Sequence, residues 1–244
     1  MQKNILITGS GEGIGYHIAE YFLQIGYHVI LSDISLEKAE NAVKKLNSPN
    51  AKAFKLDVSQ EDDFQEIIRI INEKYKKIDV LINNAGLTKT TPISDIDSKE
   101  YIEITANNQL GTFLACQKIG ALMVNQGFGR IINLSSLAGQ NGGVAVGAHY
   151  AASEGAIITI TKIFAKQYAA HGVTVNAIAC GPVDSPAFHR LVHSEEIPDI
   201  IDAIPVKQLG NMEFIAQTIA LLAQENSAFV TGATWDMNGG LNMR

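Results

Sequence analysis

The residues with the clearest chemical potential form a glycine-rich run near the start of the chain. Gly9, Gly13 and Gly15 follow a short apolar stretch and precede an amphipathic one, in the order strand, turn and helix. Glycines in such a turn let backbone N–H groups approach a pyrophosphate, and the helix N-terminus adds partial positive charge. The run therefore predicts a dinucleotide-binding turn. A tight strand–helix turn without a ligand is the alternative.

An acidic residue favours one dinucleotide over the other. Asp33 ends the second apolar run, about 20 residues after the glycines, where a carboxylate can accept hydrogen bonds from an adenosine ribose 2′-hydroxyl. A 2′-phosphate would need a cation nearby, but this region offers Glu12 and Asp33, with Ile34 and Ser35 next. Both carboxylates would repel a phosphate, so the sequence predicts NAD rather than NADP as the cofactor.

Short apolar runs that alternate with helical patterns must position these residues. This order is typical of βαβ units, and runs rich in Val, Ile and Leu are typical of parallel strands covered on both faces. Strands are predicted over residues 4–8, 28–31, 51–56, 80–82, 130–134, 174–179 and 234–236, and helices over 14–25, 36–46, 61–75, 99–126 and 148–170. The predicted fold class is α/β. We expect residues 1–244 to form one domain, a Rossmann-type doubly wound parallel sheet of about seven strands with helices on both faces.

Residues 183–210, between the sixth predicted strand and the last helix, interrupt the alternation of strands and helices. Three prolines lie there, and the apolar spacing suggests short helices. A long excursion inside a compact domain is usually a functional lid or a disordered segment, and we expect a substrate lid. His189 and His193 have the i, i+4 spacing of a metal pair. Without a nearby carboxylate motif, solvated lid residues are the better interpretation, and no metal site is predicted.

Charge and cysteine content exclude several function classes. The net charge of −6, with Lys and Arg scattered, argues against a nucleic-acid partner. Cys116 and Cys180 form no motif or disulfide framework, which fits a reducing cytoplasm. The first strand begins too early to leave room for a signal peptide, and no apolar run approaches the ~20 residues of a membrane span. We expect a cytoplasmic protein with neither nucleic acid nor membrane as a partner.

Further motifs, in order along the chain, resemble the short-chain dehydrogenase/reductase family. They are the glycine run, Asn83-Asn84-Ala85-Gly86, Asn108, Ser135-Ser136, Tyr150, residues 176–186, Thr231-Gly232 and Asn238-Gly239-Gly240. The resemblance spans essentially the whole chain, and the sequence is similar to 3-oxoacyl-acyl-carrier-protein reductases and sugar or polyol dehydrogenases of that family. It implies an oxidoreductase that interconverts a secondary alcohol and a carbonyl on a small-molecule substrate.

The resemblance also implies which residues contact the cofactor and which act on the substrate. Those that match cofactor contacts are Gly9, Glu12, Gly13, Ile14, Gly15, Asp33, Asp57, Val58, Asn84, Ala85, Gly86, Asn108, Tyr150, Gly181 and Val183, with Asp57-Val58 at the adenine. Ser136 would orient the substrate carbonyl, Tyr150 would exchange the proton and Asn108 would support a proton relay. Such groups are needed because the developing alkoxide must be stabilised and protonated. Ser136 lies one residue further from Tyr150 than is commonest in the family.

One position departs from the family pattern of Tyr-x-x-x-Lys, because Glu154 stands where the lysine belongs. The four-residue spacing puts Tyr150 and Glu154 on one helix face. A carboxylate there would raise the pKa of Tyr150 above its usual value of about 10, whereas a lysine would lower it. Three interpretations stay open: a weak or specialised enzyme, in which Glu154 could be protonated in a dry site; a dinucleotide-binding pseudoenzyme or sensor without turnover; or an altered residue, since Lys and Glu codons differ by one base. A structural protein without ligand is disfavoured by the glycine turn and Asp33.

The two longest helices predict self-association. Both carry apolar residues on more than one face, among them Phe113, Ile119, Ile157 and Ile163. A helix that is apolar around most of its surface is buried, here by a second copy, and members of the family form dimers and tetramers through these helices. We expect a homodimer or homotetramer.

Three residues elsewhere are interpreted as structural: Cys180 as a small buried thiol, Asn238 as a local support and Trp235 as a core or interface residue.

Overall fold

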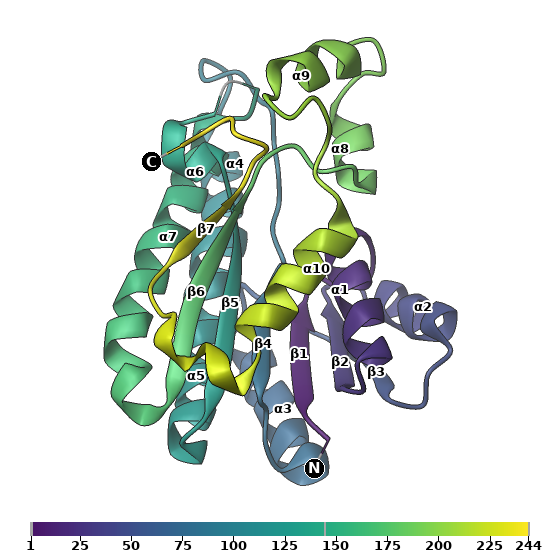
Figure 1. The fold of residues 1–244 in the computed structure, drawn as a ribbon, viewed down its shortest axis with the longest axis vertical. Coiled ribbons are helices and arrows are strands. Elements are labelled where there is room, and N and C mark those ends of the chain that lie inside the picture. Colours follow the sequence, from purple (N-terminus) through teal and green to yellow (C-terminus); the bar gives the residue numbers. More distant parts are fainter. Residues whose placement is uncertain (1, 144, 244) are drawn as a thin grey trace.

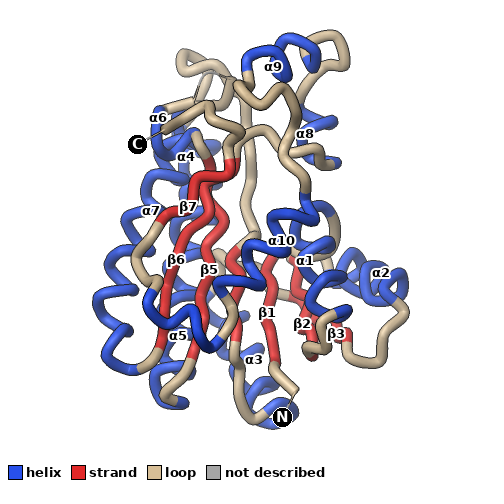
Figure 2. The backbone as a smooth tube through the Cα atoms, in the orientation of Figure 1, coloured by secondary structure: helices blue, strands red, loops and turns tan. Residues whose placement is uncertain are grey.

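Seven parallel strands form one sheet in the order β3-β2-β1-β4-β5-β6-β7 (Figure 2). The computed structural model describes residues 2–143 and 145–243. The strands are β1 (Asn4–Thr8), β2 (His28–Asp33), β3 (Ala51–Lys55), β4 (Val80–Asn83), β5 (Gly129–Ser136), β6 (Val173–Cys180) and β7 (Thr234–Met237). Every predicted strand is present, with ends within one or two residues of the prediction. The α/β class and the single doubly wound domain are confirmed.

Helices cover both faces of this sheet (Figure 1). One face packs against α3 (Glu61–Ile70), α5 (Gly111–Gln126) and α7 (Ala148–Tyr168), and the other against α1 (Gly13–Gln24), α2 (Leu36–Leu46) and α10 (Met212–Leu222). Within β1, Leu6 belongs to the first core cluster, while Ile5 and Ile7 belong to the second. Because both faces of the sheet are covered, the central strands β1 and β4 are buried throughout and show no clean alternation of apolar and polar residues.

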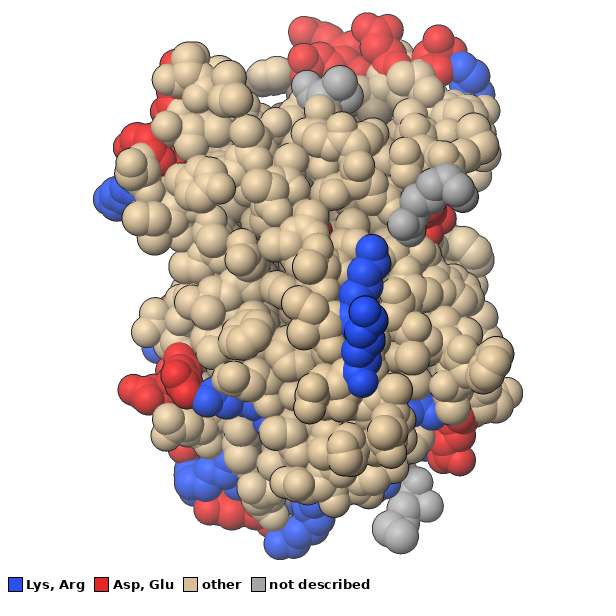
Figure 3. Space-filling model, turned by 90° about the vertical axis from the view of Figure 1, so that its left-hand side faces the viewer, with Lys and Arg blue, Asp and Glu red and all other residues tan. Residues whose placement is uncertain are grey.

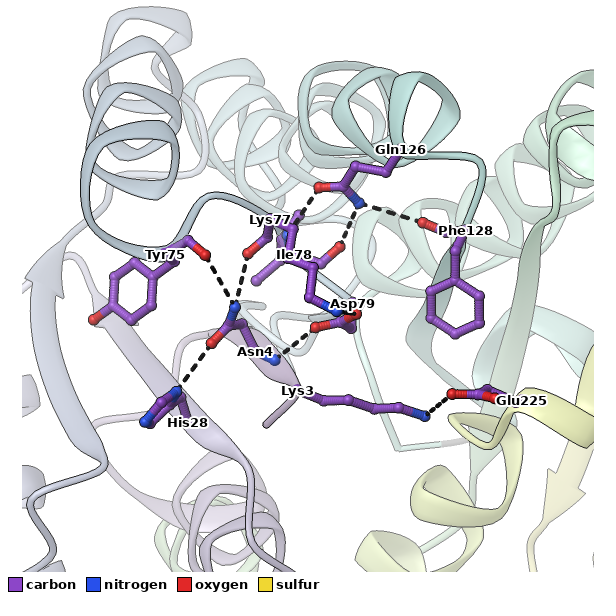
Figure 4. Close-up of polar contacts among 10 residues, drawn as sticks. All are labelled: Lys3, Asn4, His28, Tyr75, Lys77, Ile78, Asp79, Gln126, Phe128 and Glu225. Carbon is purple, nitrogen blue, oxygen red and sulfur yellow. Dashed lines mark hydrogen bonds and ion pairs between the residues drawn. The ribbon is translucent and has the colours of Figure 1, made fainter. Parts of the chain in front are cut away.

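A polar network joins β1 and β4 at their amino-terminal ends (Figure 4). The backbone N–H of Asn4 donates to Asp79 Oδ2 over 2.8 Å, and the Asn4 side chain donates to the carbonyl of Lys77 over 3.0 Å. The amide of Gln126, at the end of α5, makes a pair of hydrogen bonds to the backbone of Ile78 at 2.9 and 2.8 Å. This network fixes the end of the sheet away from the predicted site, since ligands of such sheets bind at the carboxyl ends of the strands.

Two of the predicted helices are not uniform. The one expected over 99–126 consists of α4 (Ser98–Ile104), a π-helical turn at Thr105–Leu110 and α5, and the one expected over 61–75 changes from α3 to a π-helical turn at Ile71–Tyr75. Both predicted helical segments are present, and each contains a π-helical turn that was not predicted, where the hydrogen bonds reach one residue further along the chain. Single π-helical turns often occur at functional sites, and the turn at Thr105–Leu110 contains Asn108.

Residues 183–210 contain the two short helices that the apolar spacing predicted. They are α8 (Pro186–Leu191) and α9 (Ile197–Ala203), and both lie beyond the carboxyl ends of the strands (Figure 1). A single turn that was not predicted, α6 (Ala138–Asn141), follows β5 and packs against α7.

None of the helices in the described part of the chain combines the length and the apolar composition that a membrane crossing needs.

Candidate active site

The glycine turn leaves an open face at the start of α1. Gly9 and Gly13 both adopt left-handed backbone angles, with φ of +61° and +60°. A Cβ on Gly9 would lie 2.7 Å from the Cα of Ala85, so Gly9 is needed for close packing, whereas a Cβ on Gly13 would meet nothing within 4 Å. The N-cap residue, Glu12, makes no side-chain hydrogen bond to the first turn of α1. An open, uncapped helix N-terminus fits a pyrophosphate, which would accept hydrogen bonds from the first N–H groups.

The loop after β4 holds this turn in place. Asn84 donates its side-chain amide to the carbonyls of Thr8 (3.0 Å) and Gly9 (2.7 Å). The Thr8 hydroxyl accepts the backbone N–H groups of Asn84 and Ala85 at 3.1 and 3.0 Å. Gly15 allows this contact, since a Cβ there would lie 2.6 Å from the Asn84 amide nitrogen. The structure therefore gives Asn84 a supporting contact; direct contact of Asn84, Ala85 or Gly86 with a cofactor stays a prediction.

Asp33 lies beside the glycine turn at the end of β2. It is only 9% exposed, and its carboxylate accepts backbone N–H groups from Gly11 (3.2 Å) and Ser35 (3.0 Å). The approach is close, since a Cβ on Gly11 would lie 2.8 Å from Asp33 Oδ2. These contacts bring the predicted ribose-binding carboxylate next to the turn.

Two cations that the sequence interpretation missed lie beside Glu12. Lys38 Nζ, from α2, lies 3.5 Å from its carboxylate, and Arg190, from α8, forms an ion pair with it at 2.9 Å. Both are far from Glu12 in the sequence, so no local pattern could reveal them. Because they compensate the charge of Glu12, the electrostatic case against a 2′-phosphate rests on Asp33.

The remaining predicted cofactor contacts are partly engaged within the protein. Asp57 accepts hydrogen bonds from the backbone and side chain two residues on (3.0 and 2.7 Å). Gly181 packs closely on Asn238, where a Cβ would lie 2.8 Å from the Cα. The side chains of Ile14, Val58 and Val183 pack in or against the hydrophobic core. Whether any of these residues touches a cofactor stays a prediction.

The predicted catalytic residues meet at the carboxyl ends of the central strands. Ser136 is the last residue of β5, and Tyr150 is in the first turn of α7. The hydroxyls of Ser136 and Thr88 interact with the phenol of Tyr150 and act to lower its pKa. Thr88, which follows β4, was missed because nothing in its sequence surroundings marks a hydroxyl for this contact.

The pKa of Tyr150 nevertheless lies well above its usual range. Desolvation by burial is the largest cause, and the charge of Glu154 is the second. The predicted direction of the Glu154 effect is thereby confirmed. The phenol stays protonated at neutral pH, which makes Tyr150 a competent proton donor and a weak base.

Glu154 is a buried carboxyl group one helical turn after Tyr150. It is 5% exposed, and its Oε1 accepts a hydrogen bond from the Asn108 side chain at 3.4 Å. Burial raises the pKa of Glu154 to about 8, although hydrogen bonds from Ser135 and Asn108 act to lower it. Across residues 2–143 and 145–243, no lysine or arginine forms an ion pair with Glu154. The group is therefore mainly protonated at pH 7.

Asn108 ties three segments together from the π-helical turn. It is fully buried, donates to Ser153 Oγ (3.1 Å) and exchanges two backbone hydrogen bonds with Leu87, at 3.0 and 2.8 Å. These bonds join the turn to α7 and to the loop after β4. Its predicted part in a proton relay stays a prediction.

A buried histidine that was not predicted supports the start of α7. His149 is fully buried. Its Nδ1 accepts the backbone N–H of Tyr150 at 2.9 Å, so Nε2 carries the proton and donates to Glu100 on α4, also at 2.9 Å. Lys89 Nζ lies 3.8 Å from the same carboxylate. The position of Tyr150 is thus fixed from α4 and from the loop after β4.

Other residues singled out from the sequence have local roles. His189 hydrogen-bonds to Asp184 at 2.7 Å, and the described residues contain no group of three or more potential metal ligands. Desolvation raises the pKa of the Cys180 thiol to about 12, which leaves it unreactive at neutral pH. Asn238 bonds to the backbone of the chain's last residues, at 3.0 Å to Gly240 and 3.1 Å to Asn242, which confirms its structural interpretation.

Comparison with known proteins gives consistent matches over the whole chain. A family model described as enoyl-(acyl carrier protein) reductase matches residues 9–242. The 3-oxoacyl-[acyl-carrier-protein] reductase FabG of Staphylococcus epidermidis is 34% identical, and the match covers 100% of both chains. FabG of Thermotoga maritima is 34% identical over 98% of this chain and 97% of its own, and the uncharacterized oxidoreductase YxjF of Bacillus subtilis is 32% identical over 98% of each.

Proposed function

Because the chain belongs to the short-chain dehydrogenase/reductase family of oxidoreductases, we propose that it uses NAD(H) to interconvert a secondary alcohol and a carbonyl on a small molecule. The observation that carries this proposal is the placement of Ser136, at the end of β5, and Tyr150, in the first turn of α7, where the Ser136 and Thr88 hydroxyls act on the phenol. This group lies at the same end of the sheet as the uncapped start of α1, so a dinucleotide and a substrate oxygen can be held together there.

Each residue of the group has a defined task in this proposal. The nicotinamide group supplies or accepts the hydride when it is bound. Ser136 and Tyr150 donate hydrogen bonds to the substrate oxygen, where negative charge develops during carbonyl reduction, and Tyr150 delivers the proton. Asn108 and His149 hold α7 so that the phenol stays at this point. In alcohol oxidation Tyr150 must accept a proton, and its raised pKa makes the protonated phenol slow to ionise for that step.

We propose NAD as the cofactor because of the surroundings of Asp33. Its carboxylate accepts two backbone N–H groups and forms no ion pair with any cation in the described residues. Ribose hydroxyls can donate to such a carboxylate, whereas a 2′-phosphate beside it would meet an uncompensated negative charge.

Residues 183–210 are proposed to close over the substrate as a lid. The ion pair between Arg190 on α8 and Glu12 in the glycine turn holds this segment over the dinucleotide side of the site. Both side chains are about half exposed, so the ion pair is weak and allows the segment to open.

A largely uncharged face supports a homodimer or homotetramer. Phe113 on α5 is 38% exposed and Ile163 on α7 is 58% exposed. Figure 3 shows a broad area with few charged side chains on the side of the molecule where α7 lies. Apolar patches of this kind favour association, and we propose that a second copy of the chain covers this one.

Glu154 favours a second candidate function, a dinucleotide-binding protein without turnover. The test is NADH oxidation against a panel of ketones and 3-oxoacyl thioesters, with the parent chain and with Tyr150→Phe. The leading proposal predicts activity in the parent and its loss in Tyr150→Phe, with NADH binding retained by both. Binding without turnover on any substrate would support the second candidate. Absence of binding to either NAD(H) or NADP(H) would contradict both.

A further inference from the structure

Glu154 is a buried acidic group with no cationic partner in the described part of the chain. The Asn108 side-chain amide, from the π-helical turn, donates to this carboxyl group at 3.4 Å. The Ser135 hydroxyl, from β5, donates to the backbone carbonyl of Glu154 at 3.0 Å. The titratable neighbours are Tyr150 on α7 and Cys180 on β6. Any negative charge on Glu154 is therefore left uncompensated by the protein.

The position of Glu154 exposes the reacting centre to this charge. It lies four residues, about 6 Å along the helix axis, from Tyr150, whose phenol must reach the substrate oxygen. The charge of Glu154 raises the pKa of both Tyr150 and Cys180. Cys180, on β6, is the register partner of Ser136 on β5, so it lies beside the predicted catalytic serine. A ring placed to exchange hydride beside Tyr150 would experience the same field.

We propose that Glu154 sets the preference of this site for the redox state of its dinucleotide, so that NAD+ binds more tightly than NADH. The inference rests on the proposed function. The nicotinamide ring of NAD+ carries a positive charge, and that of NADH carries none. A carboxylate near the ring stabilises only the oxidised form, whereas a lysine in its place would oppose it.

Proton release follows from this preference. Glu154 is mainly protonated in the free protein at pH 7, and a cationic ring nearby favours its ionised form, so NAD+ binding expels a proton. NADH has no charge with which to expel it. Tyr150 and Cys180 do not contribute at this pH, since burial raises the pKa of both. His149 is directed toward Glu100 rather than toward this region.

Isothermal titration calorimetry of the full chain tests this inference. NAD+ and NADH are each titrated at pH 7 in two buffers of different ionisation enthalpy, which gives the number of protons released. The variants are the parent, Glu154→Gln and, as a matched control, Glu103→Gln at an exposed position on α4. We expect the parent and the Glu103→Gln control to release up to one proton with NAD+ and none with NADH. In Glu154→Gln the release should vanish, and the ratio of the two Kd values should shift about tenfold toward NADH.

The possible results separate a failure of the Glu154 inference from a failure of the proposed function. Equal proton release with NAD+ and NADH in the parent overturns the inference without any variant, so it remains testable even if Glu154→Gln fails to fold. An unchanged Kd ratio in a folded Glu154→Gln variant also overturns it, while the proposed function stands. If neither dinucleotide binds the parent, the proposed function is wrong and this inference falls with it.

Discussion

Replacing Glu154 by lysine should increase the rate of NAD+-dependent alcohol oxidation at this site. The substitution removes a carboxyl group one helical turn from Tyr150 and introduces a positive charge at the same place. Glu154 is mainly protonated at pH 7 in the free protein, but a bound NAD+ favours its ionised form, so in the reacting complex the lysine replaces a carboxylate.

The magnitude follows from the separation of the charges. Two unit charges about 6 Å apart interact by about 3 kcal/mol at an effective dielectric of about 20. Tyr150 is partly exposed, so solvent screens the interaction, and about half of that value corresponds to about one pKa unit. Relative to a neutral Glu154, lysine should lower the pKa of Tyr150 by about one unit; relative to an ionised Glu154, by about two. With NAD+ bound and Glu154 ionised, alcohol oxidation should therefore accelerate about 100-fold.

The assay is kcat/KM for NAD+-dependent alcohol oxidation between pH 6 and pH 9, measured for the parent, Glu154→Lys and Glu154→Gln. The glutamine variant isolates the negative charge, since it should exceed the parent about 10-fold wherever Glu154 is ionised in the NAD+ complex. Thermal unfolding and NAD+ titration show whether each variant folds and binds. A folded, NAD+-binding Glu154→Lys variant that is no faster than the parent on any alcohol or carbonyl would refute the reasoning.

Four further predictions rest on separate contacts. Asp33→Asn should bind NADP+ about tenfold more tightly than the parent, as measured by calorimetry, and an unchanged affinity would remove Asp33 as the basis of selectivity. Gly9→Ala should lower Tm more than Gly13→Ala, because the two share a left-handed φ and only Gly9 packs closely on the loop after β4; equal losses would contradict the packing argument. Glu154 has a raised pKa in the folded state, so it contributes stability that is lost as pH rises from about 4.5 to about 8; urea unfolding of Glu154→Gln should lack that part of the pH dependence, and identical profiles would show that the carboxyl group does not titrate there. Ile163→Glu should shift the oligomer toward monomer in light scattering, and an unchanged mass would exclude this face as the interface.

Local pattern was sufficient to predict most of the fold. Strands such as β1, β2 and β4 contain short apolar runs, and the glycine turn and Asp33 occur where a strand ends, so apolar pattern and turn chemistry indicated both. The π-helical turn around Asn108 was not predicted because its sequence, from Thr105 to Leu110, is mainly polar and gives no apolar period to measure.

The unpredicted parts of the site depend on tertiary contacts. Arg190 reaches Glu12 from α8, across most of the chain, and His149 reaches Glu100 on α4. Thr88 contacts Tyr150 only because the loop after β4 folds over the start of α7. Such pairs depend on how elements pack, and packing is not encoded in the spacing of any one segment.

The most direct test of the account is a calorimetric titration of the full chain with NAD+ and with NADP+ under the same conditions. The open start of α1 and the carboxylate of Asp33 predict that both ligands compete for one site and that NAD+ binds at least about tenfold more tightly. Tighter binding of NADP+, or binding of neither dinucleotide, would contradict it.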